Sequence, residues 1–257
     1  MNDLVSIITP SYNTARFIAE TINSALAQTY TNWEMIIVDD CSTDNTDEIV
    51  AGFADPRIRY LKNERNSGAA FSRNRALREA RGRWVAFLDS DDLWAPDKLE
   101  KQLRFMEENG HRFSYTKYVE VDDDGNPLGR IWGGPKKVTK PVMYSFNYLG
   151  CLTVMYDREY VGTIQIADLK KRNDYAMWVK VVEKCPAYLL DEVLATYRVR
   201  SSGSIMNRNK SPLSRLKYNY YLWRDGENMN QAAALFWTGV NLVFGALKRV
   251  LYKEKLT

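Results

Sequence analysis

Short apolar runs alternate with longer segments of helical spacing over the first 110 residues. The apolar runs, which predict strands, lie at 4–9, 33–38, 58–61 and 84–88. Helices are expected over 16–28, 44–53, from the turn at 66–68 to 81, and over 96–109. This alternation predicts parallel strands joined by right-handed crossovers. The strands are apolar on both faces, as a sheet covered by helices on both sides requires.

Capping and turn residues mark the ends of these predicted helices. The side chain of Asn13 or Thr14 is expected to cap the first helix. Gly82 is expected to end the third helix. Pro96 suits the first turn of the fourth helix.

Beyond residue 114 the alternation weakens. Strands are expected at 115–121 and 152–156, a helix at 174–183, extended chain at 187–199, a polar loop at 201–211 and mainly helix at 212–256. We therefore expect one α/β domain over residues 1–211 and a helical C-terminal extension over residues 212–257, with no linker between them.

Composition and charge narrow the class of protein. The 257 residues suffice for one large α/β domain with appendages. The net charge of +4 is uneven, because nine Lys or Arg stand against three Asp or Glu from Arg208 onward. In the rest of the chain, Lys136, Lys137 and Lys140 form only a small basic patch, and no known nucleic-acid-binding motif surrounds them. We therefore expect no nucleic-acid partner.

Cysteine and histidine usage argues against structural zinc. Cys41, Cys151 and Cys185 are widely spaced, and His111 is the only histidine. The opening residues carry no basic flank and too short an apolar run for a signal peptide. These features indicate a reducing, cytoplasmic compartment.

Two acidic clusters follow predicted strands directly, one at Asp39 and Asp40 and one at residues 89–92, Asp-Ser-Asp-Asp. In open α/β sheets ligands bind at the carboxyl ends of the strands, so both clusters should face one crevice. Helix capping and turn formation are the alternative roles. Carboxylates that share a rim repel one another unless a cation balances them, and hard oxygen ligands suit Mg²⁺ or Mn²⁺. Such an ion neutralises the charge that develops on a departing diphosphate.

Four segments carry a family resemblance: VSIITPSYN, IIVDDCSTDNT, NSGAAFSRNRAL and FLDSDDLWAPDKLEKQ. In order and spacing they resemble the family 2 glycosyltransferases of the nucleotide-diphospho-sugar (GT-A) fold, densely over 4–105 and more sparsely to about 204. Within that family the chain looks most like bacterial teichuronic acid, O-antigen and capsule enzymes. The resemblance implies a mostly parallel central sheet with helices on both faces, a nucleotide-binding half (1–110) and an acceptor half (111–211).

The resemblance also implies the site. It places Pro10 and Tyr12 around the base, Asp40 with Asp39 on uracil or ribose, and Arg73 on the base or diphosphate. A solvated helix charge is the alternative for Arg73. The nucleotide-sugar residues are then Pro10, Tyr12, Asp39, Asp40, Gly68, Arg73, Asp89, Ser90, Asp91, Arg198 and Arg200. The metal candidates are Asp89, Asp91 and Asp92, and which two of them bind the ion stays open.

An inverting transfer needs one general base and a metal-assisted leaving group. The resemblance makes Asp174 the base, although Asn173 stands where a Glu is common and an N-cap role is the alternative. The segment 197–204 resembles the closing segment of the family, in which Arg198 or Arg200 would bind the diphosphate. Arg200 stands where a histidine is frequent, so the ion would rely on aspartates and diphosphate oxygens.

The tail holds an apolar stretch at 232–247, which is followed by Lys248, Arg249, Lys253 and Lys255. Sixteen residues are too few to span a bilayer. Two interpretations remain: a buried helix, or an interfacial helix that docks on the inner leaflet of the membrane. The second would bring the site to a lipid-linked acceptor.

We therefore expect an inverting, Mn²⁺- or Mg²⁺-dependent glycosyltransferase of bacterial polysaccharide biosynthesis. It would move a sugar from a nucleotide-diphosphate donor, with a UDP-sugar favoured, to a hydroxyl of a glycan or polyprenyl-diphosphate-linked acceptor. Its expected place is the cytoplasm or the cytoplasmic face of the membrane. The alternatives are a non-catalytic nucleotide-sugar-binding scaffold of the same fold and a sugar-nucleotidyltransferase. The latter needs a Gly-rich, basic loop after the first strand, where this chain has Pro-Ser-Tyr-Asn; no GxGxxG is present for a dehydrogenase.

Overall fold

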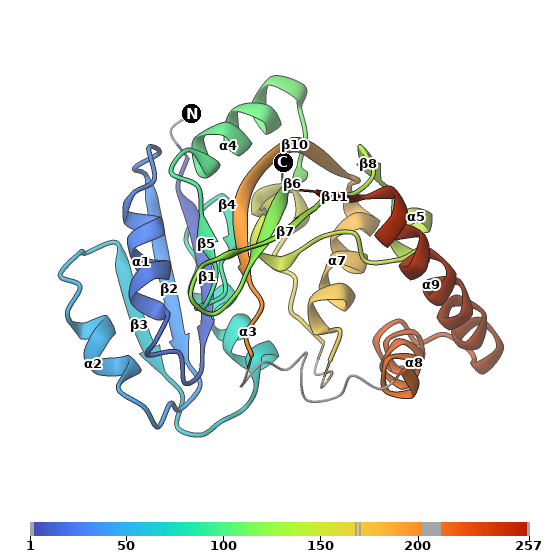
Figure 1. The fold of residues 1–257 in the computed structure, drawn as a ribbon, viewed down its shortest axis with the longest axis horizontal. Helices are drawn as coiled ribbons and strands as arrows, with labels where there is room; N and C mark the ends of the chain where they lie inside the picture. The colour runs from blue at the N-terminus through green and yellow to red at the C-terminus, as the bar shows by residue number, and fades with distance from the viewer. Residues whose placement is uncertain (1–2, 168, 170, 202–211, 256–257) are drawn as a thin grey trace.

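A computed structural model describes residues 3–167, 169, 171–201 and 212–255. Its first half follows the predicted alternation: β1 (Val5–Ser11), α1 (Ile18–Leu26), β2 (Trp33–Asp39), α2 (Thr46–Ala51), β3 (Ile58–Lys62), α3 (Ala69–Glu79), β4 (Trp84–Phe87) and α4 (Lys98–Asn109). The strands β3, β2, β1 and β4 lie side by side and are parallel, as predicted (Figure 1). The two-residue strand β5 (Leu93–Trp94) was not expected.

The second half of the sheet is more mixed than the alternation predicts. It contains β6 (Phe113–Val121), β7 (Pro127–Trp132), β8 (Lys137–Val138), β9 (Met155–Asp157) and β10 (Ala187–Arg198). Strand β9 runs antiparallel to both β4 and β6, and β10 runs parallel to β6. The strand expected at 152–156 is a 3-10 turn (Cys151–Thr153) followed by β9. The Gly- and Pro-containing segment after β6 holds β7 and β8, which the sequence did not reveal.

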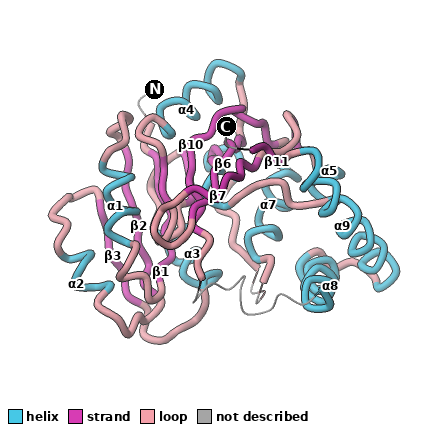
Figure 2. Tube along the Cα trace, in the orientation of Figure 1, coloured by secondary structure: helices cyan, strands magenta, loops and turns pink. Residues whose placement is uncertain are grey.

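Helices pack on both faces of this sheet, as predicted (Figure 2). Successive residues of β1 point to opposite faces. Ile7 belongs to the buried cluster that includes α1 and α4, and Ile8 belongs to the cluster that includes α3 and α7 (Asn173–Lys184). Both residues are fully buried, so the apolar run of β1 reflects burial on both sides.

Three predictions about helix ends are wrong. Helix α4 begins at Lys98 with Asp97 as its N-cap, so Pro96 precedes the helix and does not lie in its first turn. The N-cap of α1 is Phe17, and no side chain caps the helix; the backbone carbonyl of Thr14 accepts from Phe17 N and Ile18 N instead. Helix α3 ends at Glu79 without a glycine cap. Gly82 serves a close approach, because a Cβ there would lie 2.5 Å from the Leu4 carbonyl oxygen.

The C-terminal extension is helical, as predicted, and it joins the sheet. It contains α8 (Pro212–Tyr221), a π-helical turn (Leu222–Gly226), α9 (Gln231–Leu251) and β11 (Lys253–Lys255). Strand β11 pairs antiparallel with β7. Two short helices, α5 (Lys140–Ser145) and α6 (Arg158–Val161), complete the fold. Among the described residues, no helix combines the length and the apolarity needed to cross a bilayer.

Candidate functional site

A cavity of about 500 Å³ opens where β1, β2 and β4 end. Every predicted nucleotide-sugar residue except Asp39 lines it: Pro10, Tyr12, Asp40, Gly68, Arg73, Asp89, Ser90, Asp91, Arg198 and Arg200. The remaining lining residues are Ser11, Thr14, Asn66, Ala69, Ser72 and Tyr197. Sequence reasoning assigned none of these to the site, because uncharged side chains beside a motif carry no chemical signal of their own. The two acidic clusters thus contribute to one crevice, as the strand-end argument predicts.

The loops after β1 and β2 brace each other at the mouth of this cavity. Asn13 N donates to Ser42 Oγ at 2.9 Å, and Thr43 N donates to Asn13 Oδ1 at 2.8 Å. Asn13 and Cys41 both have positive φ, 50° and 63°. Such backbone is unfavourable for residues other than glycine and persists where surrounding contacts hold it. The two loops are therefore fixed as one unit.

Asp39 and Asp40 have different surroundings. The Asp39 carboxylate is fully buried and accepts from Ser42 N at 3.0 Å, so it braces its own loop. Asp40 lines the cavity and accepts from Asn63 Nδ2, Ser67 N and Gly68 N at 2.8, 2.9 and 2.7 Å. A carboxylate is favourable at this position, the N-terminus of α3. Asp40 therefore ties the loop before α3 to the end of β2.

Arg73 of α3 pairs with the first aspartate of the second cluster. Its Nη2 lies 2.5 Å from Asp89 Oδ1, and Arg73 is 7% exposed. Burial alone would lower the pKa of Arg73, but the surrounding acidic groups, first among them Asp89, outweigh burial and raise it. Arg73 Nε is buried and has no hydrogen-bond partner in the protein. Arg73 is thus a permanent cation at the cavity wall, rather than a solvated helix charge.

Asp91 and Asp92 are crowded by other carboxylates. Burial and the charge of Asp89 raise the pKa of Asp91, and Arg200 offsets part of this across 3.4 Å. Burial and the neighbouring carboxylates raise the pKa of Asp92 well above its ordinary value. Asp92 points into the protein, where Oδ1 accepts from Arg198 N at 2.9 Å and Oδ2 has no partner. Only Asp89 and Asp91 of this cluster present carboxylates to the cavity.

Arg198, at the end of β10, joins three parts of the site. It is 3% exposed, and its Nε donates to the Asp91 carbonyl oxygen at 3.1 Å. Its Nη1 donates to the Asp123 carbonyl oxygen at 2.8 Å, and its Nη2 pairs with Glu20 at 2.6 Å. The guanidinium therefore fixes the turn that carries Asp91.

The protein could supply only a few side-chain ligands to a metal ion at this cavity. The described residues contain no group of three or more His, Cys, Asp or Glu side chains arranged to hold one. Asp89 and Asp91 supply carboxylate oxygens at one rim. Burial raises the pKa of Asp91, and the neighbouring charge of Asp89 adds to this. This fits a hard cation such as Mg²⁺, which keeps most of its positions for phosphate oxygens and water.

Asp174 lies in the first turn of α7, as predicted, and is half-buried. It does not line the cavity, but its charge helps to raise the pKa of Arg73 and the pKa of Cys151. Burial is the main reason for the raised pKa of the Cys151 thiol. Asp174 thus lies within electrostatic range of the cavity wall.

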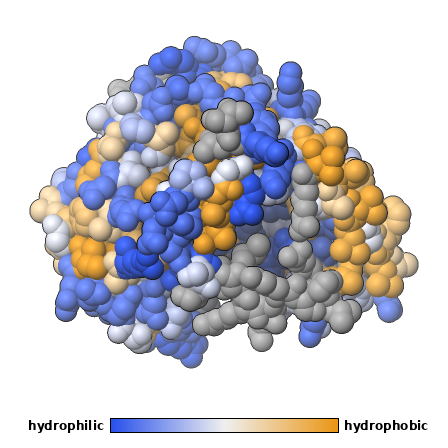
Figure 3. Space-filling model, in the orientation of Figure 1, coloured by the Kyte–Doolittle hydropathy of each residue, from blue (hydrophilic) through white to orange (hydrophobic). Residues whose placement is uncertain are grey.

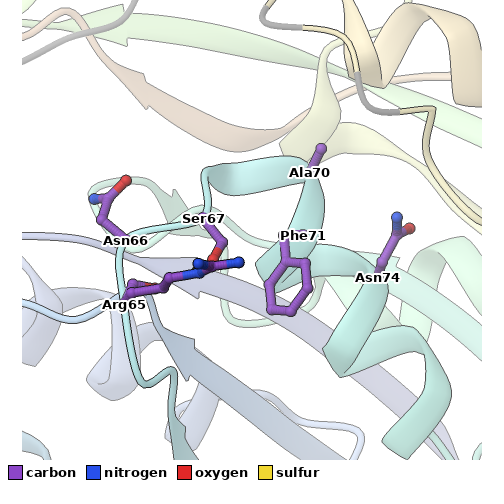
Figure 4. Close-up of a pocket in the computed structure, with 6 residues that line it drawn as sticks. All are labelled: Arg65, Asn66, Ser67, Ala70, Phe71 and Asn74. Carbon is purple, nitrogen blue, oxygen red and sulfur yellow. The ribbon is translucent and has the colours of Figure 1, made fainter.

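A second cavity, of about 510 Å³, adjoins the first at the N-terminus of α3. Asn66 lines both cavities. Figure 4 shows the residues that line the second cavity. Besides Asn66 they are Arg65 and Ser67 in the loop before α3 and Ala70, Phe71 and Asn74 in the helix.

The family is decided by comparison with known proteins. The chain matches the model of the family described as Glycosyl transferase family 2 over residues 6–159. The chain belongs to glycosyltransferase family 2. This confirms the predicted family and the predicted enzyme class.

Similar proteins support the assignment along almost the whole chain. TuaG of Bacillus subtilis (strain 168), provisionally named a teichuronic acid biosynthesis glycosyltransferase, is 43% identical over 251 residues, which cover 96% of this chain and 98% of TuaG. WfgD of Escherichia coli is 39% identical over 209 residues, covering 80% and 81%; it is named UDP-Glc:alpha-D-GlcNAc-diphosphoundecaprenol beta-1,3-glucosyltransferase. S. aureus TarS 1-349, solved with UDP-GlcNAc, aligns with a TM-score of 0.74 and 24% identity over 96% of this chain and 74% of that chain. The predicted GT-A fold is confirmed.

Proposed function

We propose that this family 2 glycosyltransferase uses a UDP-sugar and inverts the anomeric centre. The observation that carries the proposal is the convergence of Asp40, Arg73, Asp89 and Asp91 on one cavity of about 500 Å³. A cavity of this size suits a nucleotide sugar. The loop of Pro10 and Tyr12 faces the base, and the acidic turn at the end of β4 faces the diphosphate.

Asp89 and Asp91 would hold Mn²⁺ or Mg²⁺, and Asp92 would support them from behind through Arg198 N. When bound, the ion supplies positive charge to the diphosphate oxygens as they become the leaving group. Arg73 and Arg200 add fixed cations to the same cavity. Arg73 lines the cavity, although its Nε is buried, so a donor oxygen would meet the accessible part of the guanidinium. Arg198 acts on the donor mainly through the turn that it fixes.

Asp174 would be the general base. Its carboxylate takes the proton of the acceptor hydroxyl while that oxygen forms a bond to the anomeric carbon. The bond from the anomeric carbon to the diphosphate oxygen breaks in the same step, and the electron pair leaves with UDP. One displacement without an enzyme nucleophile inverts the configuration. The charge of Asp174 at Arg73 supports this role, because it links α7 to the donor cavity.

The acceptor we propose is a sugar linked through a diphosphate to a polyprenyl lipid. Support comes from WfgD, whose name specifies a UDP-Glc donor and a diphosphoundecaprenol-linked acceptor. A lipid acceptor of this kind resides in a membrane. The enzyme would therefore work at the membrane surface, as a peripheral protein.

The test begins with nucleotide sugars screened for Mn²⁺-dependent thermal stabilisation. A ligand at 100 times its Kd adds about 2.7 kcal/mol, so the donor identifies itself by the largest shift. Asp174→Asn should then keep the affinity for that donor and lower transfer by about 10²–10⁴-fold. Glu183→Gln, a carboxylate-to-amide change at the other end of α7, is the matched control. Transfer by Asp174→Asn at the wild-type rate would remove the base from this scheme.

A further inference from the structure

Helix α9 packs on the body through small and polar residues. Its inner face contains Ala234, Thr238 and Asn241, all buried. Asn241 Nδ2 donates to the Tyr144 carbonyl oxygen at 2.7 Å. Gly245 continues this face, since a Cβ there would lie 2.8 Å from the Phe146 ring. The contacts fix which side of α9 points outward.

The outward side is apolar. We define the apolar face of α9 as Leu235, Phe236, Leu242, Val243, Leu247 and Val250. Phe236, Val243 and Val250 are 62%, 60% and 78% exposed. Figure 3 shows hydrophobic atoms gathered along α9 at one edge of the molecule. A surface helix of a globular protein normally turns its polar side outward, so this reversed pattern marks a binding surface.

The dimensions of the apolar face favour a lipid surface over a second copy of the chain. A helix of 21 residues is roughly 32 Å long and, at roughly 10 Å width, offers roughly 300 Å² on one side. A stable protein interface needs about 800 Å² per partner. No charged residue occurs from Gln231 to Leu247 to form a polar rim. A lipid surface requires neither the area nor the rim.

The charges beside the apolar face match an anionic membrane. The tail from residue 212 to 255 contains seven Lys or Arg and three Asp or Glu, but Lys248 faces the protein, where its Nζ donates to the Asn147 and Tyr148 carbonyl oxygens. Lys253 and Lys255 are exposed immediately after α9. The carboxylate between them, on Glu254, bonds Lys117 at 2.7 Å. Cations at the end of an apolar helix face are attracted by anionic headgroups.

From these observations we propose that α9 lies in the plane of an anionic membrane, with its apolar face in the headgroup region and Lys253 and Lys255 on the headgroups. The inference rests on the proposed lipid-linked acceptor for its purpose, and on α9 alone for its evidence of binding. It gives the donor cavity access to an acceptor that stays in the bilayer.

The test is co-sedimentation of the full chain with vesicles of phosphatidylcholine and phosphatidylglycerol at 7:3. The double variant Phe236→Ser/Val243→Ser should bind these vesicles at least tenfold more weakly than the wild type. The matched control, Tyr160→Ser/Val193→Ser, also removes an exposed aromatic residue and an exposed valine, but outside α9, and should bind normally. Pure phosphatidylcholine vesicles should bind the wild type several-fold more weakly, because the electrostatic part is lost.

Two results would overturn the surface assignment. One is equal vesicle binding by the α9 variant and the wild type. The other is a wild-type dimer in light scattering that the α9 variant converts to monomer, with no vesicle binding by either protein. Mn²⁺-dependent binding of UDP, measured on the wild type and on the α9 variant, separates this inference from the proposed function. Wild-type protein that binds UDP but not vesicles removes only the membrane surface, and wild-type protein that binds vesicles but shows no Mn²⁺-dependent UDP binding removes only the proposed donor chemistry. The α9 variant should bind UDP as the wild type does.

Discussion

Asp40 connects the end of β2 to α3, and its replacement tests how the cavity is held. In the wild type, three N–H donors face the two oxygens of the Asp40 carboxylate. In Asp40→Asn one of these oxygens becomes an NH2 group, which is itself a donor and cannot accept a hydrogen bond. Three hydrogen bonds, from Asn63, Ser67 and Gly68, lose their ionic acceptor. Hydrogen bonds to charged groups contribute about 1.5–3 kcal/mol each, but one oxygen remains. The charge at the N-terminus of α3 adds about 0.3–1 kcal/mol.

Asp40→Asn should therefore lower the free energy of unfolding by about 2–3 kcal/mol, which corresponds to roughly 5–10 °C in Tm for a chain of this size. Chemical denaturation with urea measures it. Glu64→Gln is the matched control, because this exposed carboxylate lies in the same connection between β3 and α3. UDP binding should also weaken, since Asn66 and Gly68 line the cavity. A loss below about 0.5 kcal/mol for Asp40→Asn would refute the anchoring role.

Three further substitutions test separate parts of the account. Asp157→Asn should lower the free energy of unfolding by about 2 kcal/mol at pH 7, because the buried carboxylate accepts hydrogen bonds from Arg83 and Arg112. The bonds to these arginines outweigh burial and lower the pKa of Asp157, so the difference between variant and wild type should vanish as pH falls below about 4. A difference that does not depend on pH would contradict this. Gly82→Ala should lower the free energy of unfolding by about 2 kcal/mol, because the added methyl group overpacks against β1. An unchanged urea midpoint would show that β1 shifts to accommodate the methyl group at little energetic cost. Arg198→Met should lower the free energy of unfolding by about 2–4 kcal/mol, because two carbonyl oxygens lose their donor. The ion pair with the exposed Glu20 should contribute little to this loss. Glu20→Gln is therefore the control, and it should lower the free energy of unfolding by less than about 1 kcal/mol.

The first half of the fold could be predicted because each buried strand is a short, mostly apolar run. Parallel strands such as β1 and β2 are apolar on both faces, so their boundaries are sharp in the sequence. The antiparallel insertion of β9 between β4 and β6 could not be predicted, since three residues carry no pairing preference. Strand β11 depends on the packing of α9, which places it against β7.

The candidate site could be predicted in its membership but not in its internal contacts. The carboxyl-end rule brought Asp40 and Asp91 to one crevice from their positions after β2 and β4. Consecutive aspartates in a turn point in different directions, and only the fold shows that Asp92 turns inward to Arg198 N. The apolar stretch of the tail was visible in the sequence. Which side of α9 faces outward depends on contacts with residues such as Tyr144, far away along the chain.

The central claim is that Asp89 and Asp91 jointly hold a divalent cation that seats a nucleotide diphosphate in the cavity. Calorimetric titration of UDP into the wild-type protein, with Mn²⁺ and then with excess chelator, tests it most directly. We predict at least tenfold tighter binding with Mn²⁺ in the wild type, and no dependence on Mn²⁺ in Asp91→Asn. Equal UDP affinity with and without Mn²⁺ in the wild type, or a full Mn²⁺ effect in Asp91→Asn, would contradict the account.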